Sequence, residues 1–481
     1  MIGTYGDRRS VKDYQDFYFG SVAEYAVTLA GWMREAGIDC DLVHNSANPG
    51  SNAYHYETVR ALGAGFVLGS DHYYNLNMDW NANNPTPKYA LGALLSLESL
   101  RHMGFPPTVY ELPAGSAADW PPIQPEDLSC CYMTNLAFGM KGLNYYVFTG
   151  GANPAGIGGD GDVYDYRAPI GPDGEIRPHY VALKAFGDFL RTNGWLAEAD
   201  RVCDFRLGLD RELPRSKYYA ADLEGFGSAD AWAFLSKGLA ITSLCASYSP
   251  GTLDLNTDAM LGRTDLPLLV ASSENMAADV QRRLVRFVEN GGRLLLAPVL
   301  PDKDEYFNPC TILADFLEGA SCERLKVSYP DVQAGPAASI HVNGGLWAAK
   351  GMPAGASPIA GGAGQRQDGR LDKAIRGRRA RALARAAVAI RQARPSADAG
   401  LRAAGAGLRA VGRALRQPER VDVAADRREA PDAVRDESVL VPGDGRAQGQ
   451  AGGRLVPGDG KPRAASDGGE GDPDRRLGAR R

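Results

Sequence analysis

The sequence lacks the residue patterns of several protein classes. Its seven cysteines show no CxxC spacing. The sequence therefore does not predict a zinc site, and it favours reduced thiols over a disulfide scaffold. Its six histidines form no HxxH or HExxH pair, so metal-dependent hydrolysis has no support and we expect no cofactor. No apolar run in the sequence approaches the length needed to span a bilayer.

Charge is also low. The net charge of −5 argues against nucleic acid or an anionic membrane as the main partner. The first ten residues, MIGTYGDRRS, lack the basic and apolar regions of a signal peptide, so we expect a cytoplasmic protein. A length of 481 residues is enough for two or three domains.

Helical and strand-like patterns alternate through residues 1–200. A long amphipathic helix is expected over 12–36, and further helices over 54–63, 89–104, 125–142 and 179–194. Strand-like runs lie between them at 38–47, 65–74, 107–115 and 143–151. This alternation predicts a parallel sheet with helical crossovers. Four such units make either half of a (β/α)8 barrel or part of an open doubly wound sheet.

A second α/β region is predicted over residues 201–330. Strand-like runs read FRLGLD, LPLLVAS and RLLLAPVLP, and an amphipathic helix over 274–292 ends in two glycines. The pattern resembles a flavodoxin-like or glutamine-amidotransferase-like domain. Residues 331–354 look like the start of a β-rich domain.

Residues 355–481 differ in character from the rest. From residue 348 onward there is no Phe, Tyr, Trp, Cys, His or Asn, and a segment this poor in large apolar residues is expected to be disordered. It is either a natural low-complexity tail or a frameshifted reading of a GC-rich gene. Back-translation of residues 419–447 in a shifted frame can give a strand-like sequence, which favours the frameshift.

Three segments carry the strongest chemical signal: 108–120 (TVYELPAGSAADW), 142–154 (GLNYYVFTGGANP) and 162–186, which opens DVYDYRAP. They resemble family 35 of the glycoside hydrolases, β-galactosidases with a (β/α)8 barrel whose nucleophilic Glu ends strand seven. The resemblance implies that Glu111 is the nucleophile. It also maps two family motifs onto residues 144–153 and 164–169. The chain departs from the family at Leu112-Pro113, where aromatics are common.

A retaining glycosidase needs one carboxylate to attack the anomeric carbon and a second carboxyl to protonate the leaving oxygen. Glu111 follows the β-branched run TVY and precedes a Pro-Gly loop, where a barrel strand ends. Without the motifs it would be an ordinary loop glutamate. The resemblance further implies that Tyr146 and Tyr166 line the sugar site, for which packing in the barrel core is the alternative, and its motifs add Tyr164 and Asn144, the latter with a buried structural role as its alternative. Trp120 is expected either to wall the pocket or to serve as a core or lid residue. The strand end Asp71-His72-Tyr73-Tyr74 is a further candidate for contact with sugar.

The proton donor is expected to be missing. In the family, strand four ends in Asn-Glu-Tyr-Gly-x-Tyr-Gly, and its Glu is the acid/base. The chain begins Met1-Ile2-Gly3-Thr4-Tyr5-Gly6, so Met1 takes the position of that Glu and the four units become strands five to eight. We therefore expect an N-terminally truncated barrel that is inactive on β-galactosides or oligosaccharides as given.

Other functions remain open. An active amidotransferase would need a Cys in a Gly-x-Cys-x-Gly turn, but the corresponding turn reads LVASSENM at 269–276. The 201–330 region is instead expected to serve packing and contacts in a homo-oligomer. A non-catalytic sugar-binding or scaffold remnant is the main alternative to the hydrolase, and it predicts a stable chain that binds galactose.

Overall fold

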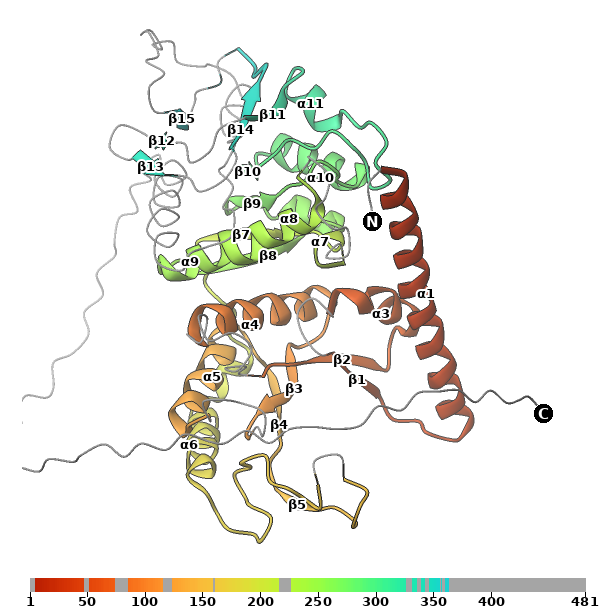
Figure 1. Ribbon diagram of the computed structural model, residues 1–481, viewed down its shortest axis with the longest axis vertical. Coiled ribbons are helices and arrows are strands. Elements are labelled where there is room, and N and C mark those ends of the chain that lie inside the picture. Colours follow the sequence, from red (N-terminus) through yellow and green to blue (C-terminus); the bar gives the residue numbers. More distant parts are fainter. Residues whose placement is uncertain are drawn as a thin grey trace, which may run out of the picture. The chain divides into compact units, whose positions relative to one another are not determined.

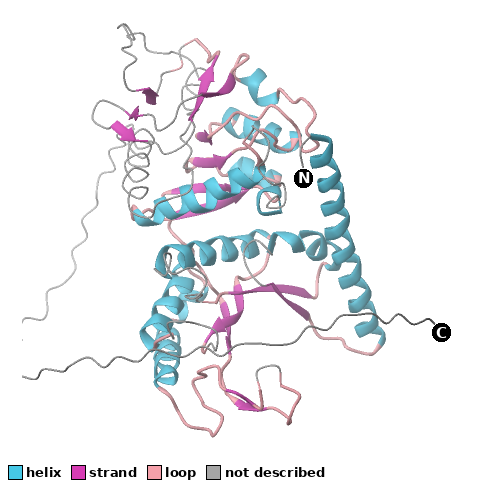
Figure 2. Cartoon of the chain, in the orientation of Figure 1, coloured by secondary structure: helices cyan, strands magenta, loops and turns pink. Residues whose placement is uncertain are grey.

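The first sheet of the chain, seen in a computed structural model, contains four strands in the order β1-β2-β3-β4, and all of its pairs are parallel. Helices alternate with these strands (Figures 1 and 2), which confirms the parallel sheet predicted from the sequence. The strands are β1 (Leu42–Ser46), β2 (Phe66–Asp71), β3 (Thr108–Pro113) and β4 (Gly142–Tyr146).

The structure describes residues 5–46, 52–73, 85–115, 123–158, 161–215, 226–325, 331–334, 339–341, 346–354, 356 and 360–362. The chain forms two units, Met1–Pro418 and Glu419–Arg481, and every described residue belongs to the first. Of residues 355–481, which were predicted to be disordered, only 356 and 360–362 are among the described residues. Within the described part, none of the helices is long and apolar enough to cross a membrane.

The helices of the first sheet lie where they were predicted, but α1 begins at Tyr5 instead of residue 12 and α5 ends at Ala137 instead of residue 142. One long helix precedes β1, and α5 begins at a proline that follows an extended residue, as expected for the first position of a helix. A short antiparallel pair, β5 (Gly151–Ala152) and β6 (Val163–Tyr164), follows β4. The helices are α1 (Tyr5–Glu35), η1 (Ala53–His55), α3 (Tyr56–Leu62), α4 (Pro85–His102), α5 (Pro125–Ala137), α6 (Pro178–Thr192) and η3 (Gly194–Ala197).

The two faces of the first sheet differ in burial. Leu68, Val109 and Leu112 lie on the face that packs against the helices, and each is fully buried. The other face carries exposed side chains, with Val43 64% and Tyr146 45% exposed. Apolar burial therefore holds the helices on one side of the sheet.

The second sheet also has four parallel strands, in the order β10-β9-β7-β8. This order matches the start of the 2-1-3-4-5 order of doubly wound folds, and the flavodoxin-like assignment stays a prediction. Strand β8 has no counterpart in the sequence-based prediction, because it opens with Pro250-Gly251. The strands are β7 (Phe205–Leu209), β8 (Pro250–Asp254), β9 (Leu268–Ala271) and β10 (Leu294–Ala297).

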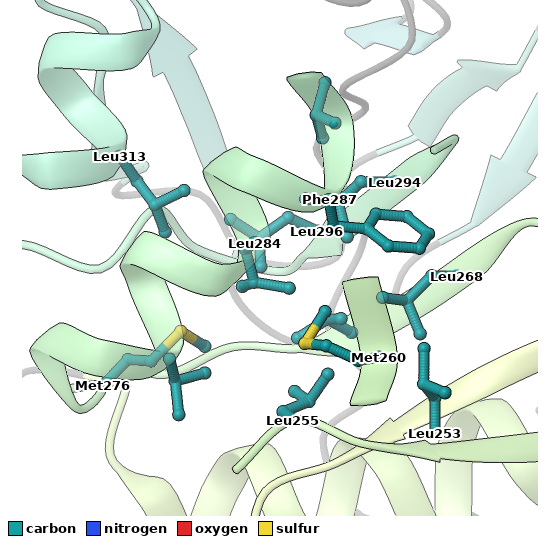
Figure 3. Packing of buried hydrophobic residues seen from close by; sticks show 13 residues of the cluster. Leu253, Leu255, Met260, Leu268, Met276, Leu284, Phe287, Leu294, Leu296 and Leu313 are labelled. Atoms are coloured by element: carbon teal, nitrogen blue, oxygen red, sulfur yellow. The ribbon is translucent and has the colours of Figure 1, made fainter. Parts of the chain in front are cut away.

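An apolar cluster fills one side of the second sheet (Figure 3). Leu284 and Phe287 of α10 (Ala278–Glu289) are fully buried there, and they pack with Leu268, Leu294 and Leu296 of the strands. The helices of this region are α7 (Glu212–Arg215), α8 (Ser228–Ala233), the π-helical η5 (Phe234–Ala240), α9 (Ile241–Cys245), η6 (Asp258–Gly262), α10 and α11 (Ile312–Phe316).

Antiparallel strands follow, and they extend on both sides of the range 331–354 that the sequence suggested for a β-rich segment. Strand β11 (Ser321–Leu325) pairs with β14 (Leu346–Lys350). Strand β12 (Asp331–Ala334) pairs with β13 (Ser339–His341) on one side and β15 (Ala360–Gly362) on the other.

Helix α4 contributes to the cores beside both sheets. Leu97 and Leu100 pack with residues of the first sheet, and Leu95 belongs to the cluster beside the second. The carboxylate of Glu98, 5% exposed, accepts hydrogen bonds from the backbone N–H and hydroxyl of Thr252 at 3.1 and 2.5 Å. A buried, hydrogen-bonded carboxylate thus links α4 to β8.

A second link is made by Arg215 of α7. Its guanidinium is 5% exposed, donates to the Ala53 carbonyl at 2.7 and 2.9 Å, and pairs with Glu57 at 2.5 Å. Its charge also lies over the Phe19 ring, 4.6 Å from the centroid. One side chain of the second region therefore holds η1, α3 and α1 together.

We predict that Arg215→Ala lowers the free energy of unfolding by about 2–4 kcal/mol, because the buried Ala53 carbonyl loses its donors and the ion pair is broken. Urea titration measures the change. Arg191→Ala is the matched control, because Arg191 is 79% exposed although it too is ion-paired, and it should cost less than about 0.5 kcal/mol. Equal losses for the two variants would contradict the assignment.

Candidate functional site

Polar side chains gather where the strands of the first sheet end. Asn45, Asp71 and Glu111 lie at or next to the carboxyl ends of β1, β2 and β3, and Tyr146 closes β4. Parallel strands bring their carboxyl ends to one edge, which is where barrels and open α/β sheets carry their sites. The topology alone therefore places these groups together (Figure 1).

Glu111 is held by one donor on each carboxylate oxygen. The amide nitrogen of Asn45 donates to Oε1 at 2.7 Å, and the hydroxyl of Tyr73 donates to Oε2. The Glu111 carbonyl also accepts from the backbone N–H of His72 at 3.0 Å. The carboxylate is therefore oriented from two neighbouring strands while it stays only partly buried.

A second carboxyl group lies beside Glu111. Asp71 is paired with Glu111 in the register of β2 and β3. Partial burial, and then the negative charge of Glu111, raise the pKa of Asp71 to about 6, although a hydrogen bond from Asn45 opposes the shift. A carboxyl group whose pKa is shifted by burial and by a neighbouring charge is typical of a functional site.

Tyrosines line the same edge. Burial and the hydrogen bond to Glu111 raise the pKa of Tyr73 well above its ordinary value, so its hydroxyl remains a donor at neutral pH. The Tyr146 ring lies edge-on to Tyr73, with centroids 6.3 Å apart. Asn144 is exposed, and its amide donates to the Tyr110 carbonyl at 3.0 Å.

His72 supports this edge from behind. It is 4% exposed, and its Nδ1 lies 2.5 Å from Oδ1 of Asn135 on α5. Burial lowers the pKa of His72 to about 4, so the imidazole is neutral at pH 7. His72 is thus fixed to α5, which limits how far the adjacent Asp71 and Tyr73 can move.

A loop after β6 closes against the end of β3. A Cβ built at Gly115 would lie 2.3 Å from the carbonyl oxygen of Tyr166, so only glycine fits there. Tyr166 and Arg167 have positive φ angles of 48° and 51°. Asp165 holds the loop by two hydrogen bonds to Arg177, at 2.5 and 2.8 Å.

The structure brings some of the predicted site residues together. Glu111, Tyr73 and Tyr146 form one group, and Asn144 binds the backbone beside it. Tyr164 and Tyr166 pair with each other in the adjacent loop, with ring centroids 5.9 Å apart. Trp120 lies outside the described residues.

Asn45 is the site residue that sequence reasoning missed, whereas Asp71 belongs to the strand end 71–74 that was a candidate for contact with sugar. The available signal was a polar residue at the carboxyl end of each predicted parallel strand. In the described part of the chain, no group of three or more His, Cys, Asp and Glu side chains could hold a metal ion.

Comparison with known proteins adds three findings. Residues 230–346 match the family model described as GLMA-like, second domain. The chain is 31% identical over 210 residues to an exo-β-D-glucosaminidase of Pyrococcus horikoshii and 33% identical over 238 residues to one of Thermococcus kodakarensis. The alignments cover 42% and 47% of this chain but only 27% and 29% of those proteins.

Solved structures of similar fold are β-galactosidases. One from Rahnella sp. R3 has a TM-score of 0.59 at 13% identity, over 87% of this chain and 60% of that one. A family 42 enzyme from G. stearothermophilus has a TM-score of 0.56 at 13% identity, over 75% of this chain and 52% of that one. The assignment to family 35 that the sequence motifs implied is not supported. The chain is similar to glycoside hydrolases that act on β-linked sugars, and its fold is that of their solved structures.

Proposed function

We propose that this chain carries the nucleophile side of a retaining β-glycosidase active site, with Glu111 as the nucleophile. The observation that carries the proposal is the Glu111 carboxylate at the carboxyl edge of a parallel sheet, with each oxygen held by one donor. A nucleophile must be presented to the anomeric carbon in one orientation. Asn45 and Tyr73 supply that orientation.

For the substrate we propose a β-D-glucosaminide, ahead of the β-galactoside that the sequence motifs imply. The relatives with 31% and 33% identity, over 210 and 238 residues, are named exo-β-D-glucosaminidases, whereas a probable β-galactosidase A of Neosartorya fischeri is 28% identical over 189 residues. The higher sequence identity to the glucosaminidases favours a substrate with an amino sugar. Tyr146, 45% exposed, supplies an aromatic face for the C–H side of a pyranose ring.

We further propose that the first sheet is half of a (β/α)8 barrel. Large apolar side chains are exposed on the inner face of the sheet and on α1. At least 60% of the surface of each is accessible to solvent: Val43 on the sheet, and Tyr14, Phe17, Tyr25 and Trp32 on α1. Apolar side chains clustered in this way mark a surface that another element covers. Further β/α units packed on α1 and β1 would supply that cover and close the sheet.

Glu111 should form a covalent adduct with 2,4-dinitrophenyl 2-deoxy-2-fluoro-β-D-glucoside. Dinitrophenolate departs without a proton, so formation of the adduct does not require a general acid. Mass spectrometry of peptides locates the sugar. Glu111→Gln should abolish the adduct, whereas Glu175→Gln, in an exposed loop, should leave it unchanged.

An adduct on another residue, or equal labelling of wild type and Glu111→Gln, would refute the nucleophile assignment. Sugar binding without any adduct would support the alternative, a non-catalytic carbohydrate-binding chain.

Tyr73→Phe should slow formation of the adduct by about 10- to 100-fold, because one hydrogen bond to a charged oxygen is lost. Labelling time courses measure the rate. Tyr306→Phe is the matched control, because Tyr306 is 44% exposed and its ring lies beside Lys12. If both variants react at the wild-type rate, the Tyr73 hydroxyl does not orient the nucleophile.

Glu111→Gln should also lower the pKa of Asp71 from about 6, because it removes the neighbouring charge, but burial should keep that pKa above its ordinary value. Carboxyl ¹³C NMR titration, with Asp71→Asn to identify the signal, measures it. The folded-state pKa exceeds the unfolded value of about 3.9, so Asp71 stabilises the fold most below pH ~4 and loses that contribution as pH rises through ~6. An unchanged titration would show that the two carboxyls do not interact.

A further inference from the structure

The group around Glu111 has more hydrogen-bond acceptors than donors. The Oδ1 atoms of Asp71 and Asn45 are both covered from solvent, and no hydrogen-bond donor in the described part of the chain reaches either one. The amide nitrogen of Asn45 is already used, since it donates to Glu111 and Asn45 also hydrogen-bonds Asp71. Covered acceptors without donors are costly. A bound group with several donors would satisfy them.

The position of Asp71 identifies which part of a sugar it would meet. Asp71 and Glu111 are register partners on adjacent parallel strands, and such strands lie about 4.8 Å apart. Glu111 attacks C1 in the proposed reaction, and C2 is bonded directly to C1. The other ring neighbour of C1 is the ring oxygen, which carries no substituent, so the nearest ring substituent that a group beside Glu111 can contact is the one on C2.

The three common substituents at C2 differ in what they donate. A hydroxyl or an acetamido N–H donates one hydrogen bond and carries no charge, whereas an ammonium group donates three and is positively charged. Only the ammonium group can satisfy Asp71 and Asn45 together. It also offsets the repulsion between two carboxylates on neighbouring strands.

We propose that Asp71 is the residue that determines specificity at C2, by pairing its carboxylate with the C2 ammonium group of a β-D-glucosaminide while Asn45 accepts a second hydrogen bond. The assignment rests on the proposed function, because it needs Glu111 to be the group that faces C1.

The electrostatics of the site support this pairing. Burial and then the charge of Glu111 raise the pKa of Asp71 to about 6, which shows that negative charge on Asp71 is opposed by its neighbour. A cation held between them relieves this repulsion and lowers the pKa of Asp71 again. Binding at pH 6 should therefore release protons to the buffer.

Isothermal titration of the full chain with three methyl β-glycosides tests the proposal. Methyl β-D-glucosaminide, methyl N-acetyl-β-D-glucosaminide and methyl β-D-glucoside differ only at C2. We expect the wild type to bind the amine at least about 10-fold more tightly than the other two, with a heat at pH 6 that varies with the ionisation enthalpy of the buffer. Equimolar ammonium chloride should not reproduce the effect.

Asp71→Asn keeps the size of the side chain and removes its charge. The variant should bind the three glycosides within about 2-fold of one another, and a thermal melt that matches the wild type shows that the variant folds. Asp188→Asn is the matched control, because Asp188 lies in an exposed ion-pair cluster on α6, and it should leave the preference intact.

Two failures are distinguishable. If Glu111 is labelled but the wild type shows no preference for the amine, or Asp71→Asn keeps that preference, the role of Asp71 is wrong and the nucleophile assignment stands. If Glu111 is not labelled and none of the three glycosides binds, the proposed function is wrong and the role of Asp71 falls with it.

Discussion

Two carboxylates held on adjacent strands are the constraint around which the edge of the first sheet is built. Asp71 and Glu111 are register partners, so the pairing of β2 with β3 holds the two carboxyl groups next to each other. Asn45 contacts both carboxyls, and Tyr73 donates to Glu111. These donors offset part of the repulsion, and they also fix the direction in which the Glu111 oxygens point. A purely structural pair of neighbours on a sheet would not need such an arrangement.

The backbone of the strands is irregular at the same place. The register of β2 and β3 shifts between Ser70 and Asp71, and that of β3 and β4 shifts between Val109 and Leu112. Irregularities of this kind change the direction of a side chain and occur next to active sites. Here they separate the residues that pack against the helices from the carboxylates at the edge. The buried contact between His72 and Asn135 then holds the end of β2 against α5.

The sequence predicted the elements of the first sheet better than the contacts at its edge. Apolar runs alternating with amphipathic helices determine a parallel sheet, and parallel strands must end at one edge, so Glu111 could be placed there. The partner of Glu111 could not be found in this way, because Asn45 lies 66 positions earlier and its role depends on the register between strands. Strand β8 was missed because Pro250 and Gly251 hide the strand pattern, although both are buried in the second sheet.

The second region affects the site through α4, which leads directly into β3 and so into Glu111. Leu95 packs beside the second sheet while Leu97 and Leu100 pack beside the first, so α4 cannot shift without disturbing both cores. Glu98 adds a directional restraint through its hydrogen bonds. Burial acts to raise the pKa of Glu98, but hydrogen bonds and positive charge from Arg101, together with Thr252 and Arg201, lower that pKa overall. The carboxylate is thus ionised and bonded to β8 at neutral pH. The region that matches a GLMA-like second domain therefore helps to position β3 without contributing a described residue to the Glu111 cluster.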